Sequence, residues 1–469
     1  MTIEELTRKH PEYAARNKDW TKWRSCYDGI AAIIDAGLFQ QHERESDDNY
    51  DRRKKAAMSF DVCHSIVDLF TQFLFSQTIE RDWNGLDENE LFAMFLQDSD
   101  MDSTSFPLRM QYDSAWAAVY GSIGYVIDSP QDMPATVAEQ TALRVYPYIT
   151  RYFPPAILEW ETERILGRKT LTWLKLQEDD SHYKIWTREN WELWKYDPKT
   201  DATPTLEGSA AHDLGEIPFI RVCNIPDPDS YMFGVSDLRG LSDFELSLVE
   251  NISQGEEIIG YAAFPMMRKP YKKAGEDPND DTGPTAILEF DPEYPESKAD
   301  WLEAKVSDPL TALMEWMQIK VQRAYKSMHA ADVAGVEDRE AKSGVALKME
   351  FTELGAALRT KASAFEHAER QIIRLWAKWQ KVAEKVKIQY PAEFDFAELA
   401  EELGTLMLAK SLVPSLTFAE AVGKHAARQA LPKLTPEDLE AIDSELEAAG
   451  PELLVEQIEP EEPEVIDPV

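Results

Sequence analysis

Several features that mark other classes of protein are scarce or missing in this chain of 469 residues. No uninterrupted apolar run reaches the ~18 residues that a membrane-spanning helix needs, so we expect no membrane span. The three cysteines, Cys26, Cys63 and Cys223, lie far apart, and none belongs to a CxxC pair. Such cysteines are typical of small buried side chains in a reducing compartment rather than of disulfides or zinc ligands. Residues 1–5 form neither a basic nor an apolar stretch, so we expect no signal peptide.

The sequence also lacks the motifs of common catalytic and cofactor sites. The eight histidines are dispersed, and no HExxH or GxSxG motif occurs. Ala341-Lys342-Ser343 resembles the end of a phosphate-binding P-loop, but Gly335 does not stand at the offset that such a loop requires. The acidic segment 277–283 is similar to a calcium loop, but it lacks glycine at the sixth position and is not followed by the final glutamate. We therefore expect no enzymatic activity, no metal and no cofactor.

Positive charge is in short supply as well, because 86 acidic residues face 49 basic ones and the formal net charge is −37. A chain of this charge should not coat nucleic acid non-specifically, because that binding rests on Lys and Arg. Two explanations stay open: the charge serves solubility or a salty habitat, or it forms a surface that repels phosphate. A hydrophobic content of 43%, with thirteen Trp and nineteen Phe, is enough for a core and excludes global disorder.

The first half of the chain reads as helices followed by an antiparallel β region. Apolar periodicity predicts helices at residues 52–77, 91–96 and 106–120, and a first strand at 125–127. Short runs rich in aromatic and β-branched residues predict further strands at 146–153, 156–161, 170–177, 183–187, 191–196 and 217–224. The tryptophans of this region favour cross-strand packing over a base-stacking platform; they are Trp173, Trp186, Trp191 and Trp194.

The second half is mainly helical. We predict helices at residues 236–261 and 309–328, separated by a stretch rich in Pro, Lys and Asp with one strand at 286–290. A long helix should begin at Ser343, because no proline occurs between there and Tyr390; at about forty-five residues it would span ~65 Å, and Gly355 could bend it.

Two motifs and the order of these elements resemble a known family. H-x-L-G-x-I-P occupies residues 212–218, S-G-x-A-L-K occupies residues 343–348, and residues 120–126 fit the same family. From about residue 10 to 450, this order is similar to that of the portal proteins of tailed double-stranded DNA bacteriophages. The resemblance implies an α+β, mainly helical fold with a wing of helices and antiparallel strands. The implied segments are wing 1–235, stem helix one 236–261, clip 262–308, stem helix two 309–328, tunnel loop 329–342, long kinked wing helix 343–391, helical crown 392–450 and a disordered acidic tail 451–469.

Portal proteins form a ring, usually of about twelve subunits, at one capsid vertex of the virion. The resemblance therefore implies a homododecamer whose channel carries double-stranded DNA during genome packaging and ejection. It also implies docking of the terminase large subunit and a head–tail adaptor protein, contact with the major capsid and scaffolding proteins, and a stay in the host cytoplasm during assembly. No membrane partner is implied.

The resemblance assigns channel-facing roles to the two stem helices. The first carries an acid at every seventh position of one face; these acids are Asp243, Glu250 and Glu257. If this stripe faces the channel, rings of negative charge would keep DNA from sticking; alternatively, the stripe faces outward and solvates the helix. On the second stem helix, Lys320, Arg323 and Lys326 are candidates for transient phosphate contact or for pairing with acids of neighbouring subunits.

Two further sites follow from the resemblance. The tunnel-loop residues facing DNA would be Val333, Val336, Glu337, Asp338, Arg339, Glu340 and Lys342. The densest basic cluster lies in the implied clip, where it would dock an acidic partner or form salt bridges between subunits; it comprises Arg268, Lys269, Lys272 and Lys273. We expect the basic face of the long helix to pair with acids of neighbouring subunits.

Two other classes of function compete with a portal. A capsid-associated adaptor or scaffold protein without a DNA channel is one, and a DNA-processing enzyme such as a nuclease or packaging ATPase is the other. The missing P-loop and metal motifs argue against the enzyme.

Overall fold

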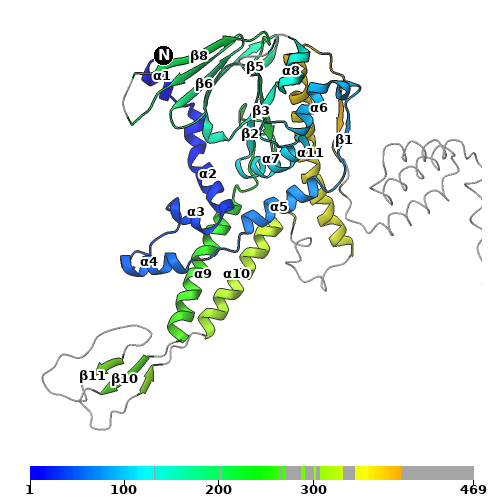
Figure 1. Ribbon diagram of the computed structural model, residues 1–469. Coiled ribbons are helices and arrows are strands. Elements are labelled where there is room, and N and C mark those ends of the chain that lie inside the picture. The colour runs from blue at the N-terminus through cyan, green and yellow to red at the C-terminus, as the bar shows by residue number, and fades with distance from the viewer. Residues whose placement is uncertain are drawn as a thin grey trace, which may run out of the picture. The chain divides into compact units, whose positions relative to one another are not determined.

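The computed structural model describes residues 1–130, 134, 136–199, 203–263, 266–270, 287–290, 300–302, 307–330, 344–391 and 394. The chain divides into two compact units, Met1–Phe394 and Asp395–Val469. All described residues belong to the first unit, which mixes helices with mainly antiparallel sheets (Figure 1). None of the described helices is long and apolar enough to cross a lipid bilayer. The predicted tunnel loop, crown and acidic tail lie outside the described residues, apart from residues 329–330 and 394.

Helices form the N-terminal part of this unit. They are α1 (Ile3–Thr7), α2 (Pro11–Asp28), α3 (Ile30–Asp35), α4 (Asp47–Ala56), α5 (Val62–Leu74), α6 (Glu90–Gln97) and α7 (Phe106–Tyr120), with a short helix α8 (Val137–Leu143) further along. The helices predicted at 91–96 and 106–120 are thus confirmed. The single helix predicted at 52–77 is wrong. Helices α4 and α5 are separate, because the backbone is extended at Ala57 (φ −64°, ψ 138°) and left-handed at Asp61 (φ 51°).

Two antiparallel sheets make the β region. The three-stranded sheet has the order β3-β2-β9, and the five-stranded meander has the order β4-β5-β6-β7-β8. Their strands are β2 (Ser122–Asp128), β3 (Tyr148–Tyr152), β4 (Ile157–Ile165), β5 (Arg168–Gln177), β6 (His182–Thr187), β7 (Asn190–Lys195), β8 (Thr205–Ala211) and β9 (Phe219–Cys223). Trp186 and Trp191 are buried and oppose each other across β6 and β7, so the prediction of cross-strand packing is confirmed for this pair.

The turn from α7 into β2 lies against the chain that leads to α9. Gly121 has φ 86°, and a Cβ placed there would lie 2.5 Å from the carbonyl oxygen of Gly234. A Cβ on Gly234 would lie 2.4 Å from the carbonyl oxygen of Gly121. Only glycine allows two main-chain segments to approach so closely, which explains why both positions lack a side chain.

The described residues of the second half form three long helices and a small sheet (Figure 1). Helix α9 (Leu241–Ala263) leads into strand β10 (Met266–Pro270), which pairs parallel with β11 (Ile287–Phe290) and antiparallel with β12 (Asp300–Leu302). Helix α10 (Ser307–Ser327) then returns alongside α9. The helices predicted at 236–261 and 309–328 and the strand at 286–290 are confirmed, with shifts of a few residues at their ends.

The long helix is shorter than predicted. Helix α11 runs from Gly344 to Gln380, 37 residues, and is continuous through Gly355. It ends because Lys381 takes a left-handed conformation with φ 55° and the Val382 amide donates to the Ala377 carbonyl at 3.0 Å, a helix-terminating arrangement. The chain then forms β13 (Lys387–Gln389), which pairs antiparallel with β1 (Glu80–Asp82). Residues 387–388, which the prediction placed at the end of the long helix, therefore belong to a strand that pairs with β1.

The core of the unit gathers around α11 and the buried strand β2. Both faces of β2 are covered, since all seven of its residues are buried. The apolar side of α11 packs into the same region through Leu358, Phe365, Ile372 and Trp376, all at most 1% exposed. The indole of Trp376 donates to the Pro147 carbonyl at 3.1 Å and that of Trp379 to the Ile127 carbonyl at 2.7 Å, so the helix is fixed to β2 and to the chain before β3.

Candidate functional site

The paired helices α9 and α10 carry most of the sequence-predicted site residues that the structure describes. One side of α10 packs on α9, where Leu313 lies 3.4 Å from the position that a Cβ on Gly255 would take. One turn after Trp316, the Lys320 ammonium donates to the Ser247 hydroxyl of α9 at 2.6 Å. The sequence explains why this side of α10 packs on α9, because apolar residues recur along it at helical period; they are Leu313, Met317, Val321 and Ala324.

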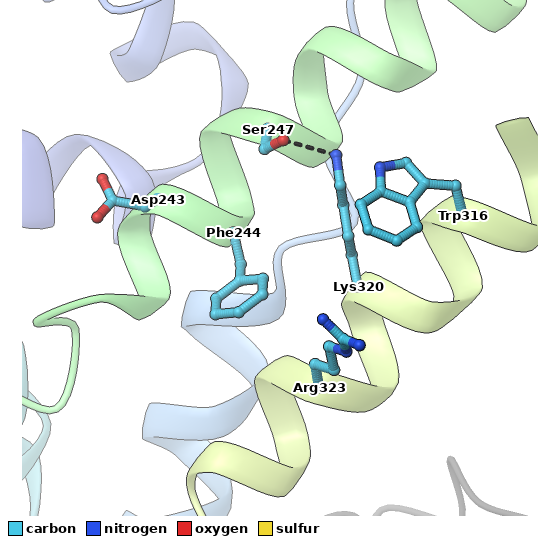
Figure 2. A pocket seen from close by; sticks show the side chains of 6 residues that line it. All are labelled: Asp243, Phe244, Ser247, Trp316, Lys320 and Arg323. Atoms are coloured by element: carbon cyan, nitrogen blue, oxygen red, sulfur yellow. Dashed lines mark hydrogen bonds between the residues drawn. The ribbon is translucent and has the colours of Figure 1, made fainter.

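A hollow of about 230 Å³ opens between the two helices (Figure 2). Its walls combine two aromatic rings with charged and hydroxyl groups; the residues are Asp243, Phe244, Ser247, Trp316, Lys320 and Arg323. Figure 2 shows the Trp316 ring beside the Lys320 side chain, whose ammonium lies 5.5 Å from the ring centre. Burial lowers the pKa of Lys320. The hollow therefore offers an apolar floor with cationic groups at its edge.

The acidic stripe of α9 has partners within the same chain. Asp243 forms an ion pair with Lys22 of α2 at 3.0 Å, Glu250 with Arg53 of α4 at 3.0 Å, and Glu257 with Arg52 of α4 at 3.5 Å. The side chain of Asp243 nevertheless remains 70% exposed, against 24% for Glu250. Each of the three acids thus contacts a cation from α2 or α4.

Arg53 is the centre of this contact between α4 and α9. Its side chain is fully buried, and its guanidinium contacts Glu45 at 2.9 Å, Glu250 at 3.0 Å and the Ser253 hydroxyl at 3.0 Å. The same group lies 4.4 Å from the ring centre of Phe39. A planar guanidinium with several fixed donors suits this set of acceptors, whereas a lysine could not serve all of them.

A second buried carboxylate of α9 holds α5 in place. Glu245 is fully buried, and it accepts a hydrogen bond from the backbone amide of Cys63 at 3.0 Å and another from the Ser59 hydroxyl. Cys63 lies in the first turn of α5, where amide groups without a helical partner favour a negative charge. Cys26, Cys63 and Cys223 are all buried, as the sequence analysis predicted.

The start of the α9 segment is fixed to α11 by a buried ion pair. The Lys361 ammonium contacts the Asp237 carboxylate and the Asn224 side-chain oxygen, and Asn224 donates to Asp237 at 2.8 Å. The ammonium also lies 5.0 Å from the ring centre of Phe70. Burial lowers the pKa of Lys361, and the neighbouring Asp237 opposes this shift. This contact joins α11, the residue that follows β9 and the loop before α9.

The basic face of α11 pairs with acids of its own chain. Arg374 makes two contacts with Glu216, at 2.7 and 2.9 Å, and Lys378 contacts the same carboxylate at 2.5 Å. Arg370 contacts Glu366 one turn earlier on the helix at 2.6 Å. Pairing with neighbouring subunits, which we expected for this face, is therefore not needed to explain it.

Several predicted site residues lie outside the described residues. They are the tunnel-loop set Val333, Val336, Glu337, Asp338, Arg339, Glu340 and Lys342, and the basic residues Lys272 and Lys273. Arg268 and Lys269 belong to β10, in register with Leu288 and Glu289 of β11. Lys326 lies in the last turn of α10 and is exposed. Among the described residues, no group of three or more His, Cys, Asp or Glu side chains is arranged to hold a metal ion.

The sequence reasoning missed the residues that position this site. Glu245 and Lys361 are charged residues inside apolar helical stripes, whereas Arg53 is the buried residue of the polar helix α4. Each has a partner far away in the sequence. A charged residue on the buried side of a predicted helix is a signal that a partner is required, because an unpaired buried charge is very unfavourable. That signal identifies the residue but not its partner.

The chain resembles solved structures but no family model and no curated protein. No protein-family model matches the chain, and no curated protein matches it. Among solved structures, the chain is similar to one in "Neck of empty GTA particle computed with C6 symmetry", with a TM-score of 0.46 and 10% identity over 82% of this chain and 95% of that chain. For a chain in "Virion of native gene transfer agent (GTA) particle", the TM-score is 0.45 and the identity 10%. The match covers 85% of this chain and 99% of that chain. At these values the likeness decides neither the family nor the function.

Proposed function

We propose that this chain is a portal-type structural protein: copies of it form a ring at one capsid vertex, and the ring encloses the channel through which a double-stranded DNA genome is packaged and ejected. The observation that carries this proposal is the pair of long antiparallel helices α9 and α10, with a small sheet formed by the residues that connect them. This arrangement fits the stem and clip implied by the resemblance in sequence.

The charges of the chain support a conduit rather than a DNA-binding protein. A channel through which DNA must slide needs weak contacts with phosphate, and a net charge of −37 disfavours tight ones. The compensated stripe on α9 modifies this idea. Asp243, as the most exposed of its three acids, is the best candidate to face DNA, whereas Glu250 serves mainly to hold Arg53.

The proposal also covers partners and location. The ring would be part of the virion and would assemble in the host cytoplasm with the major capsid and scaffolding proteins. The terminase large subunit and a head–tail adaptor would dock on the clip, residues 262–308, where Arg268, Lys269, Lys272 and Lys273 supply positive charge. We propose no catalytic activity for the chain itself, because the sequence lacks P-loop and metal-binding motifs.

Imaging of the purified full-length protein tests the proposal. Negative-stain electron microscopy should show rings with a central hole, and native mass spectrometry should give about twelve copies of the 53.5 kDa chain. Monomers or compact dimers at all concentrations would contradict a portal and favour an adaptor or scaffold. ATP or DNA hydrolysis by the same preparation would favour a DNA-processing enzyme.

A further inference from the structure

The hollow between α9 and α10 gathers hydrogen-bond donors that no carboxylate of its own walls accepts. The Lys320 ammonium donates to the Ser247 hydroxyl at 2.6 Å and keeps N–H groups to spare. Arg323 lies one turn further along α10 and lines the same hollow. Asp243 is the acid among the lining residues, but it pairs with Lys22 at 3.0 Å, and in Figure 2 its carboxylate points away from both cations. Within the described part of the chain, neither Lys320 nor Arg323 forms an ion pair.

These two cations differ from the buried cations of the chain. Lys175, Arg53 and Lys361 are buried, and each contacts a carboxylate. Burial also lowers the pKa of Lys320, and no carboxylate of the described residues opposes that shift, as Asp237 does for Lys361. A cation that leaves water without an anion nearby is unfavourable. The two cations of the hollow therefore favour the approach of an anion.

The sequence of α10 supplies no such anion. No Asp or Glu occurs from Trp316 to Ala330, although 86 of the 469 residues are acidic. The usual partners of a helical cation are acids three or four positions away, and this stretch contains all such positions for Lys320 and Arg323. On α9, the acids of the seven-residue stripe pair with cations of α2 and α4. The anion must therefore come from outside these two helices.

The lining of the hollow defines the kind of anion. The Phe244 and Trp316 rings lie beside the two cations in a space of about 230 Å³. A carboxylate on a short hydrocarbon stem suits this space, because its oxygens accept hydrogen bonds from Lys320 and Arg323 while its methylene groups contact the rings. A DNA duplex carries its phosphates on a convex surface, which protruding cations reach better than cations that line a hollow. The hollow therefore fits an inserted acidic side chain.

We infer that the hollow binds the side-chain carboxylate of an Asp or Glu from a second copy of this chain. Two copies with a formal net charge of −37 each repel one another, so a stable assembly needs contacts between cations and carboxylates across its interfaces. A ring repeats the same contact at each interface. This inference rests on the proposed ring and deepens it by naming one contact between its copies.

Zero-length crosslinking of the full-length protein tests this contact. A carbodiimide activates a carboxylate, the Lys320 amine attacks it, an amide forms, and the carbodiimide leaves as a urea. In rings assembled from isotope-labelled and unlabelled copies, we expect amides between Lys320 and an Asp or Glu of the copy that carries the other isotope. Rings in which Lys320 is crosslinked only within its own copy, or not at all, would overturn the inference.

Two conservative variants serve as matched controls. Lys320→Arg keeps the charge but has no amine, so it should form rings without this crosslink. Arg323→Lys places an amine at the neighbouring cation and should give new crosslinks to the same acidic segment of the other copy. New crosslinks from position 323 to an unrelated segment would contradict a single binding site.

Removal of both cations supplies a second measurement. Lys320→Met with Arg323→Met should leave a folded chain by circular dichroism, because neither side chain is fully buried. The ring fraction in native mass spectrometry should fall about tenfold, because charge-assisted hydrogen bonds are lost at each interface. Lys18→Met with Lys199→Met removes the same charge at exposed positions and should leave that fraction unchanged.

The outcomes separate the contact from the portal proposal. Normal rings from the Lys320→Met, Arg323→Met variant would refute the contact and leave the portal proposal standing. Defective DNA packaging by those normal rings would assign the two cations to DNA instead. If the parent protein forms no rings, the portal proposal fails, and the presence or absence of Lys320 crosslinks between copies then decides the contact alone.

Discussion

The Lys361 ammonium and the Asp237 carboxylate form an ion pair inside the protein, where their side chains are only 4% and 2% exposed. Helix α11 and the loop before α9 meet at this point, so the pair links the longest of the described helices to the base of the α9–α10 pair. A single buried charge costs far more free energy than a buried ion pair. The fold is therefore stable only when both Lys361 and Asp237 are present.

Removal of one partner should therefore destabilise the fold. We expect Asp237→Asn and Lys361→Met each to lower the free energy of unfolding by about 3–5 kcal/mol, measured by urea denaturation. The matched control is Lys381→Met, which breaks an exposed contact with Asp213 and should have little effect. Equal, small losses for all three variants would show that the buried pair is not a principal link.

Arg53 should be needed in its native form rather than merely as a positive charge. Arg53→Lys keeps the charge but cannot contact Glu45, Glu250 and Ser253 together, so we expect a loss of about 2–4 kcal/mol in the same measurement. Arg52→Lys, at the neighbouring exposed position, should change stability much less. A stable Arg53→Lys protein would mean that the geometry of the guanidinium is unimportant.

His212 should make stability sensitive to mild acid. Burial lowers the pKa of His212 from its usual value of 6.5, while the ring contacts the Thr187 carbonyl through Nε2 at 3.1 Å. As the pH falls below about 6.5, the unfolded chain takes up a proton that the folded chain resists, so stability should decrease until the folded pKa is reached. His212→Gln should reduce this slope of unfolding free energy against pH, whereas His42→Gln, at an exposed position, should preserve it.

The basic cluster at 268–273 should act in packaging rather than in ring assembly. Reversal of all four charges, at Arg268, Lys269, Lys272 and Lys273, should abolish DNA packaging while rings still form, because an acidic docking partner would be repelled. The measurement is the yield of DNA-filled heads, with ring formation followed by electron microscopy. Normal packaging would refute docking at this cluster, and loss of rings would favour salt bridges between subunits.

Deletion of residues 331–341 tests the predicted tunnel loop. Ring formation should be unaffected, whereas packaging or retention of DNA should be impaired, because the deletion removes the residues expected to face the DNA. The amount of DNA protected from nuclease in purified heads measures the effect. Filled heads at normal yield would argue against a DNA-facing role for this loop.

Elements with a strong local pattern could be predicted from the sequence, and elements defined by distant partners could not. The apolar stripe from Leu241 to Ile252 predicted α9, and the aromatic runs around Trp186 predicted the meander. Strand β13 was missed because residues 387–389 become a strand only by pairing with residues 80–82. The break between α4 and α5 was missed for the same reason, since Glu245 of α9 supplies the hydrogen bonds there.

The same distinction applies to the candidate site. Helical period correctly placed Asp243, Glu250 and Glu257 on one face of α9. Period alone does not say what that face contacts, and here its acids form ion pairs with Lys22, Arg52 and Arg53.

The contact between Gly121 and Gly234 has a mechanical consequence. The main chains of the α7–β2 turn and of the segment before α9 touch directly, and the Asn224 amide donates to the Gly121 carbonyl at 3.0 Å. A mechanical force on the α9–α10 pair would be transmitted to β2 through this contact between peptide groups. Peptide groups are planar and rigid, whereas side chains can change rotamer. The joint is therefore rigid, and bending is expected further along the helices rather than at their base.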